Sequence, residues 1–163
     1  MRVLKSSMKD IKGCLSHNTD HWSTPSNLYK AFMDQGYIDP CPLNADFDGL
    51  QRTYKNTKLY VNPPFSKLAE WVDWCIKQYF NGCEIYLLMP SRTDTKYFDR
   101  LYALLPHIFF IKGRLHFNDS KKCAPFPTCI IHMYRHTDFW KGRYCICELE
   151  NFIHWYLLND YGY

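Results

Sequence analysis

One tetrapeptide of the sequence has residue types suited to amino-group chemistry: Asn62-Pro63-Pro64-Phe65, directly after the short apolar run 58–61. The Asn62 side-chain oxygen and the Pro63 carbonyl can accept both hydrogens of a planar exocyclic amine, such as N6 of adenine. This turns the nitrogen lone pair toward an electrophilic methyl group. The prolines keep φ at about −65° and lack an N–H donor, so the loop is rigid and its carbonyls stay free. Phe65 offers a ring on which a base can stack, and the pattern therefore predicts methylation of an amine.

The same tetrapeptide also has a simpler interpretation. Two prolines after a strand can merely end that strand, and Phe65 can be an ordinary core aromatic. The rest of the chain must decide between these two interpretations.

Length and composition indicate a globular protein with one hydrophobic core. The chain has 163 residues, 47% of them hydrophobic, and a net charge of +4, which permits nucleic acid as a partner. No apolar run approaches the roughly 18 residues that span a bilayer, and residues 1–5 lack a signal peptide's apolar stretch. We therefore expect a cytoplasmic protein with no membrane partner, whose eight cysteines are reduced thiols.

Turn residues and apolar periodicity divide the chain into an arm and one layered domain. Residues 1–20 show no clear period and are predicted to form an amino-terminal arm, followed by a single domain over 21–163. Helical spacing predicts helices at 25–35, 68–79, 97–105 and 152–157. Apolar runs predict strands at 36–38, 58–61, 84–90, 108–111, 129–134 and 144–147. This alternation predicts an α/β fold, in which ligands bind at the carboxyl ends of the strands.

The first predicted helix has a candidate cap. Thr24 precedes Pro25, so we expect the Thr24 side chain to cap the helix and Pro25 to occupy its first position. The segment 43–57 is polar and is expected to be mostly loop.

Several separated segments, taken in order, resemble the phage-type DNA N6-adenine methyltransferases, the Dam-like family. The segments are Trp22-Ser23-Thr24-Pro25, Ile38-Asp39-Pro40-Cys41, Asp48-Gly49-Leu50, Tyr60-Val61-Asn62-Pro63-Pro64-Phe65, and the later runs 89–95, 113–117 and 124–126. The resemblance covers roughly residues 22–134 and favours methyl transfer over a simple strand end. Because bacteriophages and prophages carry this family, it also implies the cytoplasm of a bacterial host cell.

The resemblance implies a Rossmann-like S-adenosylmethionine-dependent methyltransferase fold, with a mostly parallel central sheet, an antiparallel edge and a reduced size. It implies S-adenosylmethionine as the cofactor, beside the Asn62 loop. The residues implied to act in catalysis are Asn62, Pro63, Pro64 and Phe65. The residues implied to bind the cofactor are Trp22, Thr24, Pro25, Asp39, Pro40, Cys41, Asn44 and Asp48.

The sequence departs from the family pattern at the cofactor segments. Asp39-Pro40-Cys41 stands where amino-methyltransferases have Asp-Pro-Phe and a glycine-rich turn, and here the glycines are missing. The interval from Asp39 to Asn62 is short for two strand–helix units, because one crossover needs about 10–12 residues. The ribose-binding acid is either Asp46 or Asp48, and Asp48 before a glycine also fits a plain turn.

For the nucleic acid, we expect duplex DNA with the target adenine flipped out of the stack. Arg92, Lys112 and Arg114 are predicted phosphate contacts, whereas Lys121 and Lys122 fit a solvated surface equally well. The reaction needs no strong general base, because the proton leaves after charge has built up on nitrogen. Catalysis would come from positioning and from acceptors near that charge.

The cysteines raise the possibility of a metal site. Cys145 and Cys147, with Cys14 and His17 or with Cys123, could make a tetrahedral zinc site. Alternation along a strand instead places Cys145 and Cys147 on one buried face, where thiols pack as small hydrophobes. The prediction is no metal.

Taken together, the sequence predicts an enzyme that transfers a methyl group from S-adenosylmethionine to N6 of adenine in DNA. Two alternatives stay open. The same fold could act on another planar amine, namely cytosine N4, RNA adenine or a glutamine side chain, or the chain could be a non-enzymatic nucleic-acid-binding module. No base-reading motif is present, and the oligomeric state is open.

Overall fold

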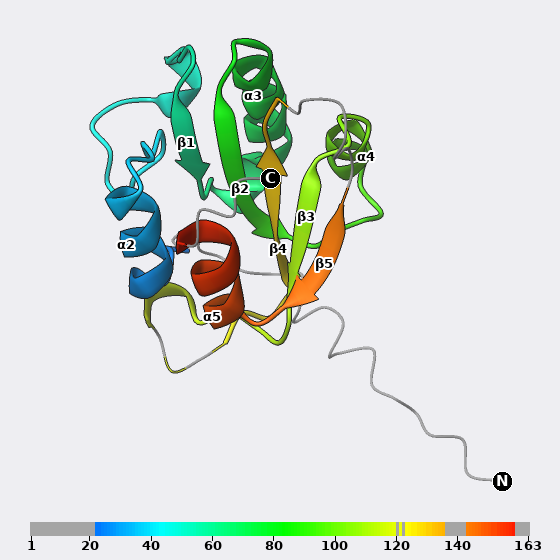
Figure 1. The fold of residues 1–163 in the computed structure, drawn as a ribbon. Coiled ribbons are helices and arrows are strands. Elements are labelled where there is room, and N and C mark those ends of the chain that lie inside the picture. Colours follow the sequence, from blue (N-terminus) through cyan, green and yellow to red (C-terminus); the bar gives the residue numbers. More distant parts are fainter. Residues whose placement is uncertain (1–21, 120, 122, 136–142, 159–163) are drawn as a thin grey trace, which may run out of the picture.

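The computed structural model describes residues 22–119, 121, 123–135 and 143–158. The predicted arm, residues 1–20, lies outside these residues. A five-stranded sheet forms the centre of the molecule (Figure 1). Its strands are β1 (Lys58–Val61), β2 (Glu84–Pro90), β3 (His107–Ile111), β4 (Thr128–Met133) and β5 (Tyr144–Cys147). They match the predicted strands to within one residue at each end.

The strand order is β1-β2-β4-β3-β5. β1 pairs with β2, and β3 with β5, in parallel, whereas β4 is antiparallel to both of its neighbours. Of the described strands, β4 alone is reversed, so the sheet is mostly parallel in strand direction, as predicted.

The predicted position of the antiparallel strand, at an edge of the sheet, is wrong. β4 lies inside the sheet, between β2 and β3. All six of its residues are buried, which agrees with a place inside the sheet, between two strands and beneath layers on both faces. In the described residues of the loop 112–127, β3 is joined to β4 by no helix longer than the short turn Phe117–Asp119, which suffices for an antiparallel neighbour. The edge strand β5, by contrast, alternates between exposed and half-buried residues.

The sheet is covered on both faces, which gives three layers (Figure 1). Helices α3 (Leu68–Phe80) and α4 (Lys96–Tyr102) pack on the face that carries Leu59, Ile85 and Leu87. Helix α2 (Ser26–Asp34) and the carboxyl-terminal helix pack on the opposite face. The latter consists of α5 (Leu149–Asn151) and the π-helical segment η4 (Phe152–Leu158). No helix in the described part of the chain has the length and apolarity to cross a membrane.

Two local predictions need correction. The strand predicted at 36–38 is a single parallel bridge between Ile38 and Leu59. Helix α2 begins at Ser26 with Pro25 as its N-cap, and Thr24 does not cap it. The Ser26 N–H donates instead to Asp119 Oδ1, at 3.0 Å.

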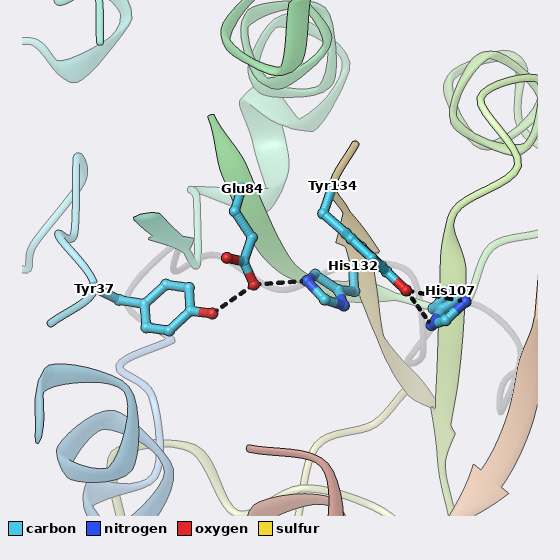
Figure 2. Close-up of polar contacts among 5 residues, drawn as sticks. All are labelled: Tyr37, Glu84, His107, His132 and Tyr134. Atoms are coloured by element: carbon cyan, nitrogen blue, oxygen red, sulfur yellow. Dashed lines mark hydrogen bonds and ion pairs between the residues drawn. The ribbon is translucent and has the colours of Figure 1, made fainter. Parts of the chain in front are cut away.

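A polar network lies at the amino ends of β2 and β3 (Figure 2). Glu84 Oε1 accepts a hydrogen bond from Tyr37 Oη at 2.8 Å and lies 2.9 Å from His132 Nε2. Tyr134 Oη lies 3.5 Å from the ring nitrogens of His107. We call these five residues the Glu84 network; it joins β2, β3 and the end of β4 to the segment after α2.

Stacking and charge support this network. The His132 ring stacks between Tyr86 and Tyr134, with ring centroids 3.8 and 4.2 Å away. Burial raises the pKa of Glu84, but the His132 contact and the Tyr37 hydrogen bond outweigh burial, so the net pKa is lowered. The carboxylate is therefore a satisfied structural group.

Candidate active site

A cavity of about 630 Å³ opens beside the carboxyl end of β1. This volume lies within the range of about 300–1,000 Å³ that is usual for small-molecule sites. We call it the Asn62 cavity. Its lining residues come from the segment before α2 and its first turn, from the loop after Ile38, and from the loop after β1: Trp22, Ser23, Thr24, Ser26, Tyr29, Asp39, Cys41, Pro42, Leu43, Asn44, Ala45, Asn62 and Pro64.

The Asn62 side chain is held by its nitrogen. Asn62 Nδ2 donates to the Trp22 carbonyl at 2.5 Å and to Thr24 Oγ1 at 3.1 Å, which uses both amide hydrogens. Asn62 Oδ1 is buried and has no hydrogen-bond partner among the described residues. A buried acceptor without a partner costs about 1–3 kcal/mol. The site therefore presents one unused hydrogen-bond acceptor beside a cavity.

The Thr24 hydroxyl links Asn62 to the sheet. Thr24 Oγ1 lies 2.9 Å from Tyr60 Oη, and Tyr60 is completely buried on β1. Burial raises the pKa of Tyr60 well above its usual value, so its hydroxyl stays protonated. Sequence reasoning missed Tyr60; the available signal was its position two residues before Asn62.

The rest of the tetrapeptide divides between the cavity and an aromatic cluster. Pro64 lines the cavity, while Pro63 is buried and is not among the lining residues. The Phe65 ring is nearly parallel to that of Trp22, with an interplanar angle of 20° and centroids 6.4 Å apart. The cluster consists of Trp22, Phe65, Phe117 and Phe126. A role for Phe65 in base stacking stays a prediction.

Asp39 and Cys41 meet at the floor of the cavity. Asp39 Oδ1 accepts a hydrogen bond from the Cys41 backbone N–H at 2.8 Å. Burial raises the pKa of Asp39, and burial together with Asp39 raises the pKa of the Cys41 thiol well above its usual value. Tyr29 also lines the cavity, and its pKa is raised by burial and by Asp39. Sequence reasoning missed Tyr29, although it lies one helical turn after Pro25.

The remaining residues predicted to bind the cofactor are spread around the cavity. Asn44 lines it, in a left-handed backbone conformation with φ 62°. Pro25 and Pro40 are buried and do not line it. Asp48 is exposed and accepts a hydrogen bond from Leu50 N at 3.0 Å as the N-cap of η1 (Gly49–Gln51). Neither Asp48 nor Asp46 lines the cavity, and the hydrogen bond from Leu50 N to Asp48 favours the turn interpretation of Asp48.

Gly49 allows this turn to approach the Asp39-Pro40 segment. A Cβ at Gly49 would lie 2.0 Å from the Pro40 carbonyl oxygen and 2.8 Å from the Trp71 ring. Real Cβ atoms do not approach other atoms so closely, so this contact requires glycine. The turn at Gly49 is thereby packed against Pro40, next in sequence to Asp39.

Comparison with known families identifies the chain. The family model for DNA N-6-adenine-methyltransferase (Dam) matches residues 13–130, more than half of the 163 residues. The chain belongs to the DNA N-6-adenine-methyltransferase (Dam) family. This confirms the predicted Dam-like family, and membership implies an enzyme that methylates N6 of adenine in DNA with a methyl donor. A search of curated proteins found no match.

In this Dam-family enzyme, the basic residues predicted to contact DNA follow β2 and β3, on the side of the sheet where these strands end. Arg92 and Arg114 are exposed. Lys112 forms an ion pair with Glu148, with Nζ and Oε1 3.0 Å apart, so a phosphate would have to compete with that carboxylate. Lys121 is exposed, and Lys122 lies outside the described residues.

The cysteines of the Dam-family enzyme do not gather into a metal site in the part of the chain that the structure describes. Cys145 and Cys147 lie on one face of β5 with their Sγ atoms 4.0 Å apart, as alternation predicts, but they are half-buried rather than buried. Cys123 is exposed, and Cys14 and His17 lie outside the described residues.

Proposed function

We propose that the Asn62 cavity binds S-adenosylmethionine and that Asn62 presents an adenine, flipped out of duplex DNA, to the methyl group. The observation that supports this most directly is the buried Asn62 Oδ1, which has no hydrogen-bond partner among the described residues although both hydrogens of the same amide are used. An adenine amino group is a donor that this acceptor can bind.

The chemistry of the cavity fits the cofactor. S-adenosylmethionine supplies a methyl group on a positively charged sulfur and also carries an ammonium group. Asp39 lines the cavity, and its carboxylate would pair with a cationic part of the cofactor. A bound cation would favour the ionised form and so oppose burial, which raises the pKa of this carboxyl. Thr24, Asn44 and Tyr29 supply further polar groups along the lining. Trp22 and Cys41 also line the cavity, and Pro25 and Pro40 belong to the same segments, so these four stay in the proposed set. A cofactor role for Asp48 stays a prediction, because its carboxylate caps the turn at Gly49–Gln51.

At the amine, the chain's own groups act as acceptors. Asn62 Oδ1 and the Pro63 carbonyl would accept the two N6 hydrogens, which directs the lone pair toward the methyl group. These oxygens would stabilise the positive charge that N6 gains when it takes the methyl group from the sulfonium, whose sulfur keeps the electron pair of the broken bond, and one N6 proton would then leave to solvent. Preorganised dipoles of this kind commonly supply the largest part of catalysis, and positioning supplies more.

The DNA would be bound outside the cavity. Flipping the adenine costs a few kcal/mol, and stacking on the aromatic cluster around Phe65 offsets part of this cost. Arg92 and Arg114 would contact phosphates, with Lys112 a weaker candidate because of its ion pair with Glu148. We further propose that residues 21–163 form one methyltransferase domain, although the family match begins at residue 13.

The test uses purified protein, S-adenosylmethionine and duplex DNA without prior methylation, followed by mass spectrometry of the nucleosides. N6-methyladenine formed by the wild type and absent with Asn62→Ala is the expected result. Binding of S-adenosylmethionine by both proteins, measured by calorimetry, separates loss of catalysis from loss of the cavity. Wild-type protein that binds the cofactor but leaves duplex adenine unmodified would overturn the duplex assignment.

A further inference from the structure

The segment that holds Asn62 is itself held by a turn far away in the sequence. Asn118 Oδ1 accepts hydrogen bonds from Ser23 N at 2.7 Å and from Ser23 Oγ at 2.6 Å. Asn118 N donates in return to the Ser23 carbonyl at 2.9 Å. We call these three bonds the Ser23–Asn118 clasp. They bind both the N–H and the C=O of one residue, so the peptide planes on either side of Ser23 are fixed.

The turn that carries Asn118 has an uncommon backbone. Asn118 lies in the left-handed region at φ 57° and ψ 24°, and Asp119 follows at φ 48°. Asparagine and aspartate tolerate this region better than other side chains do, and glycine adopts it freely. Glycine can therefore replace either residue without backbone strain, which separates the side chain's role from the turn's conformation.

The clasp lies between the two acceptors of the Asn62 amide. Asn62 Nδ2 donates to the Trp22 carbonyl and to Thr24 Oγ1, which belong to the residues on either side of Ser23. If Ser23 moves, both acceptors move. An amide that loses them can turn over and point its NH₂ at the substrate, and that group cannot accept a hydrogen from an amine.

The same loop holds the Trp22 ring. Phe117 and Phe126 meet it edge to face, with centroids 5.5 and 5.4 Å away. The loop 117–126 therefore contacts the Trp22 ring, and the Trp22 carbonyl lies next to the clasp.

From these contacts we infer that Asn118 is a positioning residue for methyl transfer: by fixing Ser23 it orients the Asn62 amide so that Oδ1, and not Nδ2, faces the adenine. This inference rests on the proposed role of Asn62. Asn118 touches neither the cavity nor the reacting atoms, and it acts through Trp22 and Thr24.

The kinetic test compares matched variants at saturating DNA and S-adenosylmethionine. Asn118→Gly removes both side-chain bonds and is expected to lower kcat about tenfold or more, because misplacement by about 1 Å can cost 10²-fold. Asn118→Asp keeps the acceptor and should restore most of kcat. Asp119→Gly, in the same turn, removes the bond to Ser26, which within the described residues is the hydrogen bond of that side chain, and should leave kcat unchanged. In all three variants KM for DNA should stay close to that of the wild type.

A second measurement does not depend on turnover. The side-chain amide of Asn62, assigned by NMR through its disappearance in Asn62→Ala, should exchange its hydrogens more slowly than that of the exposed Asn27. Asn118→Gly should lose this protection, while Asp119→Gly keeps it. If Asn118→Gly does not fold, Ser23→Ala removes the 2.6 Å bond alone and should weaken the protection.

The outcomes separate the two proposals. Wild-type protein without methylation refutes the proposed function, and the exchange measurement still tests the clasp. An active wild type in which Asn118→Gly changes neither kcat nor the exchange of Asn62 overturns the positioning role and leaves the proposed function standing.

Discussion

The two ends of the central sheet differ in whether the polar side-chain atoms beside the strands have hydrogen-bond partners. At the amino ends of the strands, Glu84 Oε1 is bonded to both Tyr37 and His132 (Figure 2). At the carboxyl end of β1, Asn62 Oδ1 has no partner in the described part of the chain, although Nδ2 of the same amide has two. A satisfied group stabilises the fold, whereas an orphaned acceptor weakens it unless a ligand binds there.

An unpaired atom alone does not mark a site. Gln78 Nε2, Ser91 Oγ and Thr128 Oγ1 are also buried without a partner in the described part of the chain, and none of these residues lines the Asn62 cavity. The Asn62 oxygen is informative because it combines a missing partner with a cavity and with a nitrogen that is already bound. The comparison therefore makes the Asn62 cavity the candidate site, because an acceptor without a partner in the described part of the chain lies beside available space there.

Replacing Asn62, at the carboxyl end of β1, should have the greatest effect on activity. Asn62→Ala should lower the rate of N6-adenine methylation by about 10²–10³-fold, the loss typical of removing one preorganised polar group. The melting temperature should fall as well, because the variant also loses the two Nδ2 hydrogen bonds to Trp22 and Thr24, so rates are compared at a temperature where both proteins are folded. Radiolabelled methyl transfer and calorimetry measure the two quantities. Substantial activity in this variant would exclude Asn62 as the amine acceptor.

Replacing Glu84, at the amino end of β2, should instead lower stability and leave the methylation rate unchanged. Glu84→Ala should lower the free energy of unfolding by about 2 kcal/mol, since it leaves His132 and Tyr37 without their shared acceptor. The methylation rate of the folded variant should match that of the wild type. Urea denaturation and initial rates at a temperature where both proteins are folded provide the check, with Lys55→Ala, at an exposed loop position before β1, as the control. A large loss of rate in the folded variant would mean that the two ends are coupled.

Acid pH should weaken cofactor binding before it unfolds the protein, because the pKa values of Asp39 and Glu84 are shifted in opposite directions. Burial raises the pKa of Asp39, so affinity for the cationic cofactor should fall at a pH where an ordinary aspartate is still ionised. The net pKa of Glu84 is lowered. Its stabilisation is therefore complete above the unfolded-state pKa and is lost only as the pH falls toward the folded-state value. Calorimetric titration and circular dichroism across mildly acid pH should show a folded protein with weakened binding.

Asp39→Asn tests the same assignment at neutral pH. It keeps an acceptor for Cys41 N but removes the charge, so cofactor affinity should fall about tenfold, the loss of one charge-assisted contact. The unliganded protein should be slightly more stable, because a carboxyl whose folded-state pKa is raised destabilises the fold at neutral pH. Unchanged affinity would place the cationic group elsewhere.

The smallest expected effect concerns Asp48. As an exposed turn cap, its replacement by alanine should cost about 0.5 kcal/mol of stability. The cofactor affinity should stay at the wild-type value. A clear loss of affinity by calorimetry would instead restore Asp48 to the cofactor site.

The elements that sequence reasoning predicted well depend on short-range pattern. Helix α3 follows its apolar spacing from Leu68 and ends before Gly82, whose φ of 90° suits glycine. Strands β2 and β4 follow continuous apolar runs. The predictions that failed depend on distant partners. Thr24 has the residue type of a cap, but its hydroxyl is taken by Asn62 and Tyr60, which are distant in the sequence.

Local chemistry in the sequence was enough to indicate the α/β class and the family, because both depend on neighbouring residues and their order; the role of the Asn62–Phe65 tetrapeptide stays a prediction. The interior place of β4, the orientation of the Asn62 amide and its support by Asn118 are properties of the folded chain. They arise from contacts between residues tens of positions apart, such as Trp22 with Asn62 and Ser23 with Asn118. Such contacts form only when the packed sheet brings these segments together, so no local pattern encodes them.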